Sequence, residues 1–265
     1  AVLVVNLGPD SPIVAAPLDN LGGIYLSTGQ LGKAEQVYLR GYEIRLKALG
    51  SRHPDLAASL NNLANLYLRT GRHNEAEPLI VRSILICELT LGENHPHMAT
   101  VLDNLGKIRF RQTRLQEAEA LFRSSLDIRQ RAFGDNHFAI GTSLNNLAAV
   151  YHSWLRFEKA EEFYGRALEI TETAFGVNHP EVASILVNIA TLRNEQGRYL
   201  GAEETGRRAL GIFSAAYGNE HIEVSRALDV LASTYAATGR ALESNSTAER
   251  AAILRANATK AFIAR

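Results

Sequence analysis

Residues 60–67 read LNNLANLY, and closely similar phrases recur along the chain at intervals of 42 positions. The other copies are LDNLGGIY at 18–25, LDNLGKIR at 102–109, LNNLAAVY at 144–151, LVNIATLR at 186–193 and LDVLASTY at 228–235. Two single-residue ladders keep the same interval: Gly8, Gly50, Gly92, Gly134, Gly176 and Gly218, and then His53, His95, His137, His179 and His221. A fixed period of this length indicates a repeat protein, in which each unit buries its apolar face against its neighbours.

One unit, residues 54–95, predicts a pair of helices. Its first half begins at Pro54, which suits the first turn of a helix, and ends before Gly71. Apolar side chains at three- and four-residue spacing form one helical stripe in this half: Leu56, Leu60, Leu63, Ala64 and Tyr67. The second half carries another such stripe and ends at Gly92. Two stripes joined by a short turn predict a helical hairpin.

Small side chains recur at one position in each predicted helix. They are Gly22, Ala64, Gly106, Ala148, Ala190 and Ala232 in the first helices, and Ala34, Ala76, Ala118, Ala160, Ala202 and Ser244 in the second helices. A larger side chain would overpack a close contact there, at a cost of about 1–3 kcal/mol. We therefore expect the two helices of each hairpin to approach closely at these positions.

These residues resemble the tetratricopeptide repeat. Its pattern of a large apolar residue, then Leu-Gly/Ala, then Tyr, then Ala in the second helix is matched by Leu60, Leu63, Ala64, Tyr67 and Ala76. The period of 42 and the LGxxHP loop are similar to the kinesin-light-chain type of this repeat, which is also common in bacterial repeat proteins. The resemblance implies an all-α fold, a tetratricopeptide α-solenoid that forms a right-handed superhelix of antiparallel helix pairs.

The period also predicts where the repeats lie. The repeats are expected at residues 18–59, 60–101, 102–143, 144–185, 186–227 and 228–265, the last one partial. Residues 1–17 are expected to be the end of a preceding repeat and its loop, because Leu7, Gly8 and Pro12 fall on Leu49, Gly50 and Pro54 after a shift of 42. The chain is therefore interpreted as a piece of a longer protein.

The amino-acid composition argues against several classes of function. The chain has 28 basic and 28 acidic residues, which argues against a general nucleic-acid or membrane-surface binder. No apolar run reaches the roughly 18 residues needed to span a bilayer. The single cysteine, Cys87, excludes an internal disulfide and a cysteine-based metal site, and its apolar helical face predicts a buried, inert thiol. The absence of disulfides favours a cytoplasmic location.

No catalytic, cofactor or metal site is predicted. The histidine ladder places one histidine in each loop, on the order of 10 Å from the next if neighbouring repeats pack as helices do. Metal ligands must each lie about 2 Å from one ion, so these histidines cannot share a metal. We expect each one to shape its loop and cap the next helix. The chain has no GxxxxGK[ST], HExxH or GxSxG motif, and we expect no enzymatic activity.

Asparagines stand at the third position of the phrase in five repeats: Asn20, Asn62, Asn104, Asn146 and Asn188. Helical phasing puts them beside the apolar stripe. The family resemblance implies that they line a concave groove and hold the backbone or carboxylates of an extended peptide, because an amide both donates and accepts hydrogen bonds. An equally weighted alternative is that they hydrogen-bond within the scaffold. Val230 breaks the ladder in the sixth repeat.

The side chains one turn further along would select the ligand: Asn65, Arg69, Lys107, Arg111 and His152. They form an amide-rich, locally basic strip, which fits an acidic peptide or a C-terminal carboxylate because charge-assisted hydrogen bonds are strong. The alternative is an ordinary solvated face. Arg109 and Arg193 replace the tyrosine of the pattern, and their guanidinium groups are expected to reach solvent. The arginines just past the first helices are interpreted as turn residues: Arg72, Arg114, Arg156, Arg198 and Arg240.

The function that fits these features is the binding of an extended, acidic peptide or partner segment in the groove. The expected partners are proteins or peptides, not nucleic acids or membranes. Two alternatives stay open, because this kind of scaffold serves many roles. The array could be the regulatory or sensor part of a larger multidomain protein, or a scaffold that self-associates through its terminal repeats, since residues 251–265 are rather apolar.

Overall fold

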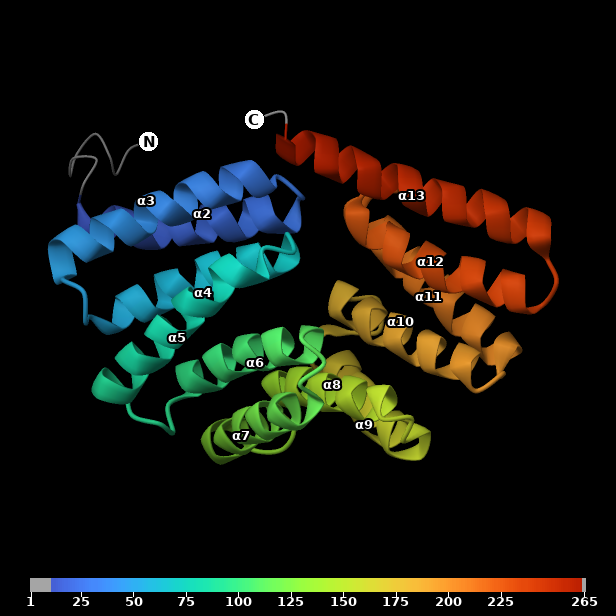
Figure 1. Cartoon of the computed structure of the whole chain (residues 1–265), viewed down its shortest axis with the longest axis horizontal. Helices are drawn as coiled ribbons and strands as arrows, with labels where there is room; N and C mark the ends of the chain where they lie inside the picture. The colour runs from blue at the N-terminus through green and yellow to red at the C-terminus, as the bar shows by residue number, and fades with distance from the viewer. Residues whose placement is uncertain (1–10, 264–265) are drawn as a thin grey trace. The chain divides into compact units, whose positions relative to one another are not determined.

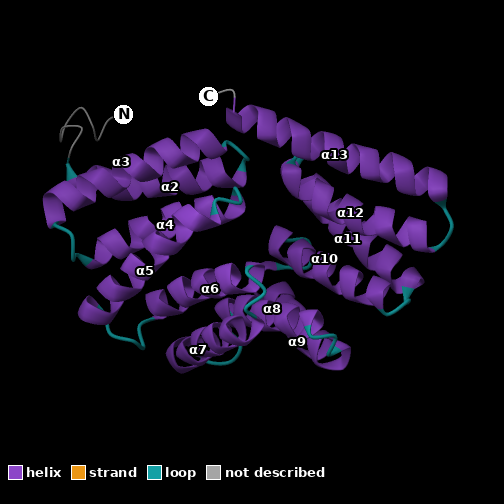
Figure 2. Ribbon diagram, viewed as in Figure 1, coloured by secondary structure: helices purple, strands orange, loops and turns teal. Residues whose placement is uncertain are grey.

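The computed structural model describes residues 11–263, with side chains up to residue 259, and this part of the chain contains helices and no strand (Figures 1 and 2). Twelve α-helices follow a short 3-10 helix, Pro12–Val14, and successive α-helices pair into hairpins. The predicted all-α class is confirmed. The predicted end of a preceding repeat falls mostly on residues 1–10, which lie outside the described residues, as do the last six side chains of the apolar C-terminal segment.

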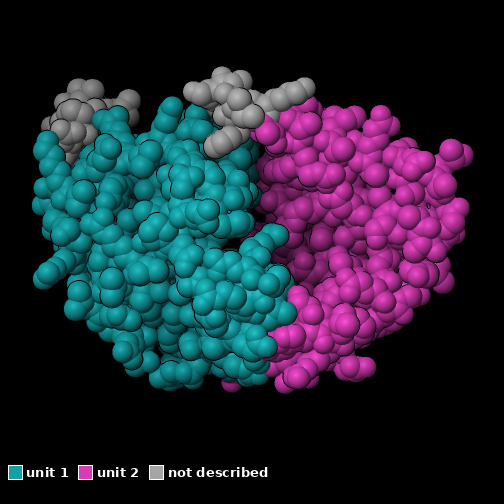
Figure 3. All heavy atoms as spheres, in the orientation of Figure 1, with its two compact units in different colours: residues 1–132 teal, residues 133–265 magenta. Residues whose placement is uncertain are grey.

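Contacts divide the chain into two compact units, residues 1–132 and residues 133–265 (Figure 3). The first unit holds α2 (Ala15–Ser27), α3 (Leu31–Leu49), α4 (Pro54–Arg69), α5 (His73–Thr90), α6 (Pro96–Arg111) and nearly all of α7 (Leu115–Phe133). The second unit holds α8 (Phe138–Ser153), α9 (Phe157–Phe175), α10 (Pro180–Glu195), α11 (Tyr199–Tyr217), α12 (Ile222–Ala237) and α13 (Ala241–Ile263). The even-numbered helices are the first helices of the hairpins.

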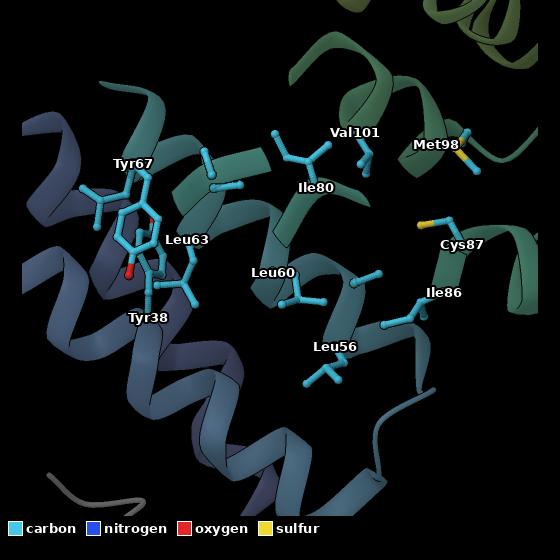
Figure 4. Close-up of a cluster of buried hydrophobic side chains, with 14 of the residues drawn as sticks. Tyr38, Leu56, Leu60, Leu63, Tyr67, Ile80, Ile86, Cys87, Met98 and Val101 are labelled. Atoms are coloured by element: carbon cyan, nitrogen blue, oxygen red, sulfur yellow. The ribbon is translucent and has the colours of Figure 1, made fainter. Parts of the chain in front are cut away.

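Each hairpin packs on the next within its unit. In the first unit α4 contacts its partner α5, the preceding α3, and the first helices α2 and α6. One buried cluster runs through these helices and includes Leu60 and Leu63 of α4 and Ile80 of α5 (Figure 4). Cys87 is fully buried in the same cluster, and burial raises the pKa of its thiol. The prediction of a buried cysteine is confirmed.

The histidine ladder caps the first helices. In five loops the Nδ1 atom of the histidine accepts a hydrogen bond of 3.1–3.3 Å from the backbone N–H two residues later. These histidines are His53, His95, His137, His179 and His221. The bond satisfies one of the four N–H groups that a helix start leaves without a partner. The predicted capping role is therefore confirmed, and the proline is not required for it, because Phe138 and Ile222 follow two of the capping histidines.

Replacing His95 by alanine should lower the free energy of unfolding by about 1 kcal/mol, because the N–H of His97 loses its acceptor. The matched variant His95→Asn keeps a side-chain acceptor at the same position and should stay close to the parent protein. Urea denaturation followed by circular dichroism measures both. Equal stabilities of the alanine and asparagine variants would show that the cap contributes nothing.

Two glycines mark the closest approach within a hairpin. A Cβ atom added to Gly106 of α6 would lie 2.5 Å from Cε1 of Phe122 on α7, and one added to Gly22 would lie 2.4 Å from Cε1 of Tyr38. Real side chains essentially never come so near, so in these two hairpins the ring as it lies leaves no room for a Cβ atom on the first helix. The expected close contact at the small-residue positions is confirmed here.

Gly106→Ala should therefore destabilise the protein by about 1–3 kcal/mol, although alanine is the better helix former. Gly165→Ala is the matched control, because Gly165 is an exposed glycine within α9 and an added Cβ would meet nothing within 4 Å. That change should raise stability, by up to about 1 kcal/mol. Chemical denaturation midpoints compare the two variants, and stabilisation by both would contradict the close approach.

Three of the arginines after the first helices contact the preceding hairpin, so for Arg72, Arg198 and Arg240 the interpretation as turn residues was incomplete. Arg72 donates to Glu75 of its own hairpin at 2.7 Å and to Glu35 of the preceding hairpin at 2.8 Å, and its guanidinium carbon lies 4.0 Å from the centre of the Tyr67 ring. Its equivalent in the second unit, Arg240, makes the same set of contacts with Glu243, Glu203 and Tyr235. The hydrogen bonds from Arg72 hold the pKa of the Glu75 carboxyl below its ordinary value. We call this arrangement the Arg–Glu clamp, and it ties successive hairpins together.

Candidate binding surface on the first helices

Apart from Asn20 on α2, the predicted peptide-binding side chains of the first unit lie on two neighbouring first helices. Asn62, Asn65 and Arg69 on α4 and Asn104, Lys107 and Arg111 on α6 each follow a spacing of three and then four residues, which places them on one face of each helix. Because α4 contacts α6, the two rows are adjacent. We call these six residues the first-helix stripe.

The asparagine ladder binds hairpin to hairpin. The Nδ2 atom of Asn104, which is only 4% exposed, donates to Oδ1 of Asn61 on α4 at 2.7 Å. In the second unit Asn188 donates in the same way to Asn145 at 2.9 Å. Asn62 hydrogen-bonds the Asp19 carboxylate of α2. For these asparagines the structure therefore shows the scaffold role that the sequence left as an alternative.

The other members of the ladder differ in their surroundings. Asn20 is exposed, and Asn146 is half-buried, with an Nδ2 atom that has no hydrogen-bond partner among the described residues. Where the ladder is broken by Val230, the partner position in the preceding repeat is also a valine, Val187, and both are buried in one apolar cluster. The two asparagines that hydrogen-bond in other repeats are thus replaced together by two valines.

Buried ion pairs connect the two helices of some hairpins at the position just before the asparagine. Asp19 lies 2.6 Å from Arg45, and Asp103 lies 2.5 Å from Arg129, with both side chains of the second pair more than 90% buried. Burial raises the pKa of Asp19, while the charge of Arg45 and hydrogen bonds from Arg45 and Asn62 oppose that rise. In the other repeats this pair of positions carries Asn61 with Cys87, Asn145 with Thr171, Val187 with Phe213, and Asp229 with Arg255.

These ion pairs were not predicted, although the sequence holds a signal for them. An arginine stands 26 positions after the second letter of the phrase only where that letter is aspartate. Removing one partner from a buried ion pair costs far more than replacing both, because a lone charge is left in a poorly solvating interior.

Arg129→Met should therefore lower the free energy of unfolding by about 3–5 kcal/mol, because Asp103 stays buried without its guanidinium partner. The double variant Asp103→Asn/Arg129→Thr copies the Asn145 and Thr171 pair of the fourth repeat and should recover most of that loss. Urea denaturation of the single variant and of the double variant measures the loss and its recovery. A single variant as stable as the parent would show that the pair contributes nothing.

Positive charge gathers at one end of the first-helix stripe. Arg69 and Arg111 are exposed in the last turns of α4 and α6. Lys107 is half-buried, and its Nζ atom lies 3.3 Å from Oδ1 of Asn104. The acidic residue of α6, Asp103, is buried against Arg129 and adds no charge to the surface. The stripe is therefore basic, as the sequence predicted for these repeats.

The second unit does not continue this basic surface. His152 on α8 has its Nε2 atom 3.0 Å from the Oε2 atom of Glu195 on α10, without the alignment of a hydrogen bond. Glu195 occupies the position that Arg69 and Arg111 hold in the first unit, and Ser153 occupies it on α8. The basic character that was predicted to extend to His152 is offset there by a carboxylate.

Arg109 and Arg193 are both held by acceptors of the scaffold, so the expectation that their guanidinium groups reach solvent was wrong. The Arg109 side chain is 13% exposed and pairs with Glu77 of the preceding hairpin at 2.7 Å. Arg193 donates to Oγ1 of Thr205 at 2.5 Å and to the carbonyl of Gly201 at 3.3 Å. Acceptors on the second helices draw both side chains inward.

No group of three or more His, Cys, Asp or Glu side chains among the described residues is arranged to hold a metal ion. In the same part of the chain, no helix combines the length and the apolar character required to cross a bilayer.

The family is settled by sequence comparison. The profile described as "Tetratricopeptide repeat" matches residues 14–79, 55–131, 97–173 and 181–252. The chain belongs to the tetratricopeptide repeat family. No curated protein matches the chain.

Solved structures share this fold. BtubC (BKLC) from P. vanneervenii is 22% identical with a TM-score of 0.63, and the match covers 84% of this chain and 89% of that one. A putative kinesin light chain from Podosopora anserina with nearly identical TPR-like repeats is 22% identical with a TM-score of 0.56, covering 77% and 97%. A Rap protein complexed with Competence and Sporulation Factor is 11% identical with a TM-score of 0.70, covering 92% and 75%. At these identities the likeness is one of fold.

Proposed function

We propose that this tetratricopeptide repeat chain is a protein-interaction module whose first-helix stripe binds an extended, acidic peptide or partner segment. The observation that carries the proposal is the separation of charge on α6. Exposed Arg111 and half-buried Lys107 lie on the stripe, whereas the acidic residue of α6, Asp103, is buried and neutralised by Arg129. The adjacent α4 adds Arg69 to the same surface.

The stripe offers two kinds of contact to such a segment. Half-buried Asn65 presents an amide that can pair with a peptide group without reading its side chain. Arg69 and Arg111 can form charge-assisted hydrogen bonds with carboxylates, and the forked guanidinium suits bidentate pairing. Asn104 acts in this proposal as a positioning residue, because its bond to Asn61 holds α6 beside α4.

The comparisons support a binding role in general terms. A Rap protein of the same fold was crystallised in complex with Competence and Sporulation Factor. Tetratricopeptide arrays present a broad surface made of adjacent helices, which suits an extended partner. The acidic preference rests on the residues of this chain alone.

The test is a fluorescence-polarisation titration with labelled peptides of equal length that carry acidic, neutral or basic side chains. Acidic peptides should bind best, and their affinity should fall as salt is raised, because screening weakens exposed charge pairs. The double variant Lys107→Glu/Arg111→Glu should bind acidic peptides about tenfold more weakly or worse.

The matched control is Arg40→Glu/Lys47→Glu, which makes the same change in net charge at two exposed positions of α3. Its affinity for acidic peptides should stay near that of the parent protein. If both double variants lost the same affinity for acidic peptides, the loss would be explained by net charge and not by the stripe. The alternative of a self-associating scaffold would be favoured by two results together. No class of peptide would bind, and light scattering would show a molecular mass that grows with protein concentration.

A further inference from the structure

One position on the second helices carries an arginine in five of six repeats. The arginines are Arg40, Arg82, Arg166, Arg208 and Arg250, at intervals of 42 or 84, and the exception is Ser124 on α7. We call this set of equivalent positions the arginine column. Serine cannot make the contacts that arginine makes in the other repeats. The contacts of the other repeats therefore define what is missing around Ser124.

In the second unit the column arginine binds the preceding second helix and the loop after it. Arg208 donates to Oε1 of Glu172 at 2.5 Å and to the carbonyl of Val177 at 3.1 Å. Arg166 lies 4.0 Å from the carboxylate of Asp135. Arg250 donates to the carbonyl of Asn219 at 3.5 Å. Two positions, those of Glu172 and Asp135, thus supply carboxylates to this guanidinium.

In the first unit the column is filled differently. Arg82 on α5 donates at 3.0 Å to the hydroxyl of Tyr42 on α3. One repeat later these two positions hold Ser124 and Ile84. The arginine and the tyrosine that occupy this space beside α5 are therefore both absent beside α7.

Both carboxylates that would face an arginine at position 124 are present in the second repeat, although the third repeat lacks that arginine. Shifting Glu172 back by 84 positions gives Glu88, and shifting Asp135 back by 42 gives Glu93. No other repeat has an acidic residue at both positions. Neither Glu88 nor Glu93 forms an ion pair within the described part of the chain, so the two acceptors are present without their usual donor.

A cavity of about 280 Å³ lies where the arginine would be. Glu88, Glu93 and Ser124 stand at its wall. Its apolar lining includes Met98 and Ile128, which are 3% and 5% exposed. Figure 4 shows Met98 on α6 near Cys87 of the buried cluster.

The cation already at this cavity is engaged by two other residues of the cavity lining. Arg131 on α7 lines the cavity, but its guanidinium bonds Oδ1 of Asn94 at 2.9 Å and pairs with Asp127. It reaches neither Glu88 nor Glu93. The cavity is therefore acidic at its mouth and apolar at its floor.

We infer that this cavity binds an arginine side chain of a protein partner, which takes the place of the missing column arginine. The apolar floor accepts the aliphatic stem, and the two carboxylates accept the guanidinium, whose planar fork can bond two acceptors at once. The volume lies just below the range of about 300–1,000 Å³ typical of drug-sized ligands, which fits one side chain. This site is separate from the first-helix stripe and has the opposite charge preference.

Met98 reports on this site directly, because it is the single methionine of the 265-residue sequence and it lines the cavity. With a ¹³C-methyl label on methionine, one methyl signal follows a titration with N-acetyl-arginine amide. We expect a saturable shift. The neutral isostere N-acetyl-citrulline amide should give no saturable shift, and N-acetyl-lysine amide should bind about tenfold more weakly.

Two variants separate binding in the cavity from other causes. Ser124→Arg restores the column arginine, so it should abolish the arginine-induced shift and raise the melting temperature. Glu88→Gln/Glu93→Gln leaves the cavity open and should also abolish the shift. His95→Asn, which changes the same loop without changing charge in the cavity, should bind like the parent protein.

Several results would overturn the inference. Citrulline and arginine derivatives that bind equally would show that charge plays no part. Binding that survives in both the Ser124→Arg and the glutamine variants would place the probe elsewhere, and no saturable shift with the arginine derivative would remove the site. Free L-arginine that binds far more tightly than the blocked derivative would indicate a small-molecule site in place of a protein side chain.

Discussion

The contact between successive hairpins is the constraint on which each unit depends. A helical hairpin cannot bury its own apolar face, so its stability is shared with the hairpins on either side. In the first unit this contact is closed by buried apolar side chains such as Leu60, by the amide bond from Asn104 to Asn61, and by the Arg–Glu clamp from Arg72 to Glu35. The sequence repeats every 42 residues because each hairpin must present the same kinds of surface to its neighbours.

This constraint decides which residues remain for a ligand. Asn104 is buried and already bonded, so it positions α6 and leaves contact with a ligand to its neighbours. Arg69 and Arg111 lie further along the same faces, where no contact between hairpins requires a fixed residue type, and the equivalent positions in the second unit carry serine and glutamate. We expect ligand-binding residues at positions that differ between repeats, and residues that stabilise the fold at positions that stay the same. Ser124 combines the two, since it is a variable residue within a constant column.

Much of the fold could be predicted from the sequence because its determinants are local. The apolar spacing around Leu60, the capping histidines and the glycine opposite Phe122 each act within one helix, loop or hairpin. The polar contacts were harder, because they join positions 26, 37 or 43 apart, and these offsets depend on how the helices lie beside one another. Arg109 was expected to reach solvent for this reason: its partner Glu77 belongs to the preceding hairpin. The sequence was enough to name the residues of the candidate stripe. It was not enough to tell which of them hydrogen-bond within the scaffold, as Asn104 does.

The even charge balance of the chain conceals a separation of charge along α6. Arg111 lies in the last turn of this helix, on the basic stripe, and Met98 lies near its first turn, in the acidic cavity. At 1.5 Å per residue the two positions are about 20 Å apart along the helix. That distance exceeds the roughly 8 Å screening length at physiological ionic strength, so each surface acts on its own surroundings. A net charge of zero is therefore compatible with one unit that selects acidic groups at one end of a helix and arginine at the other.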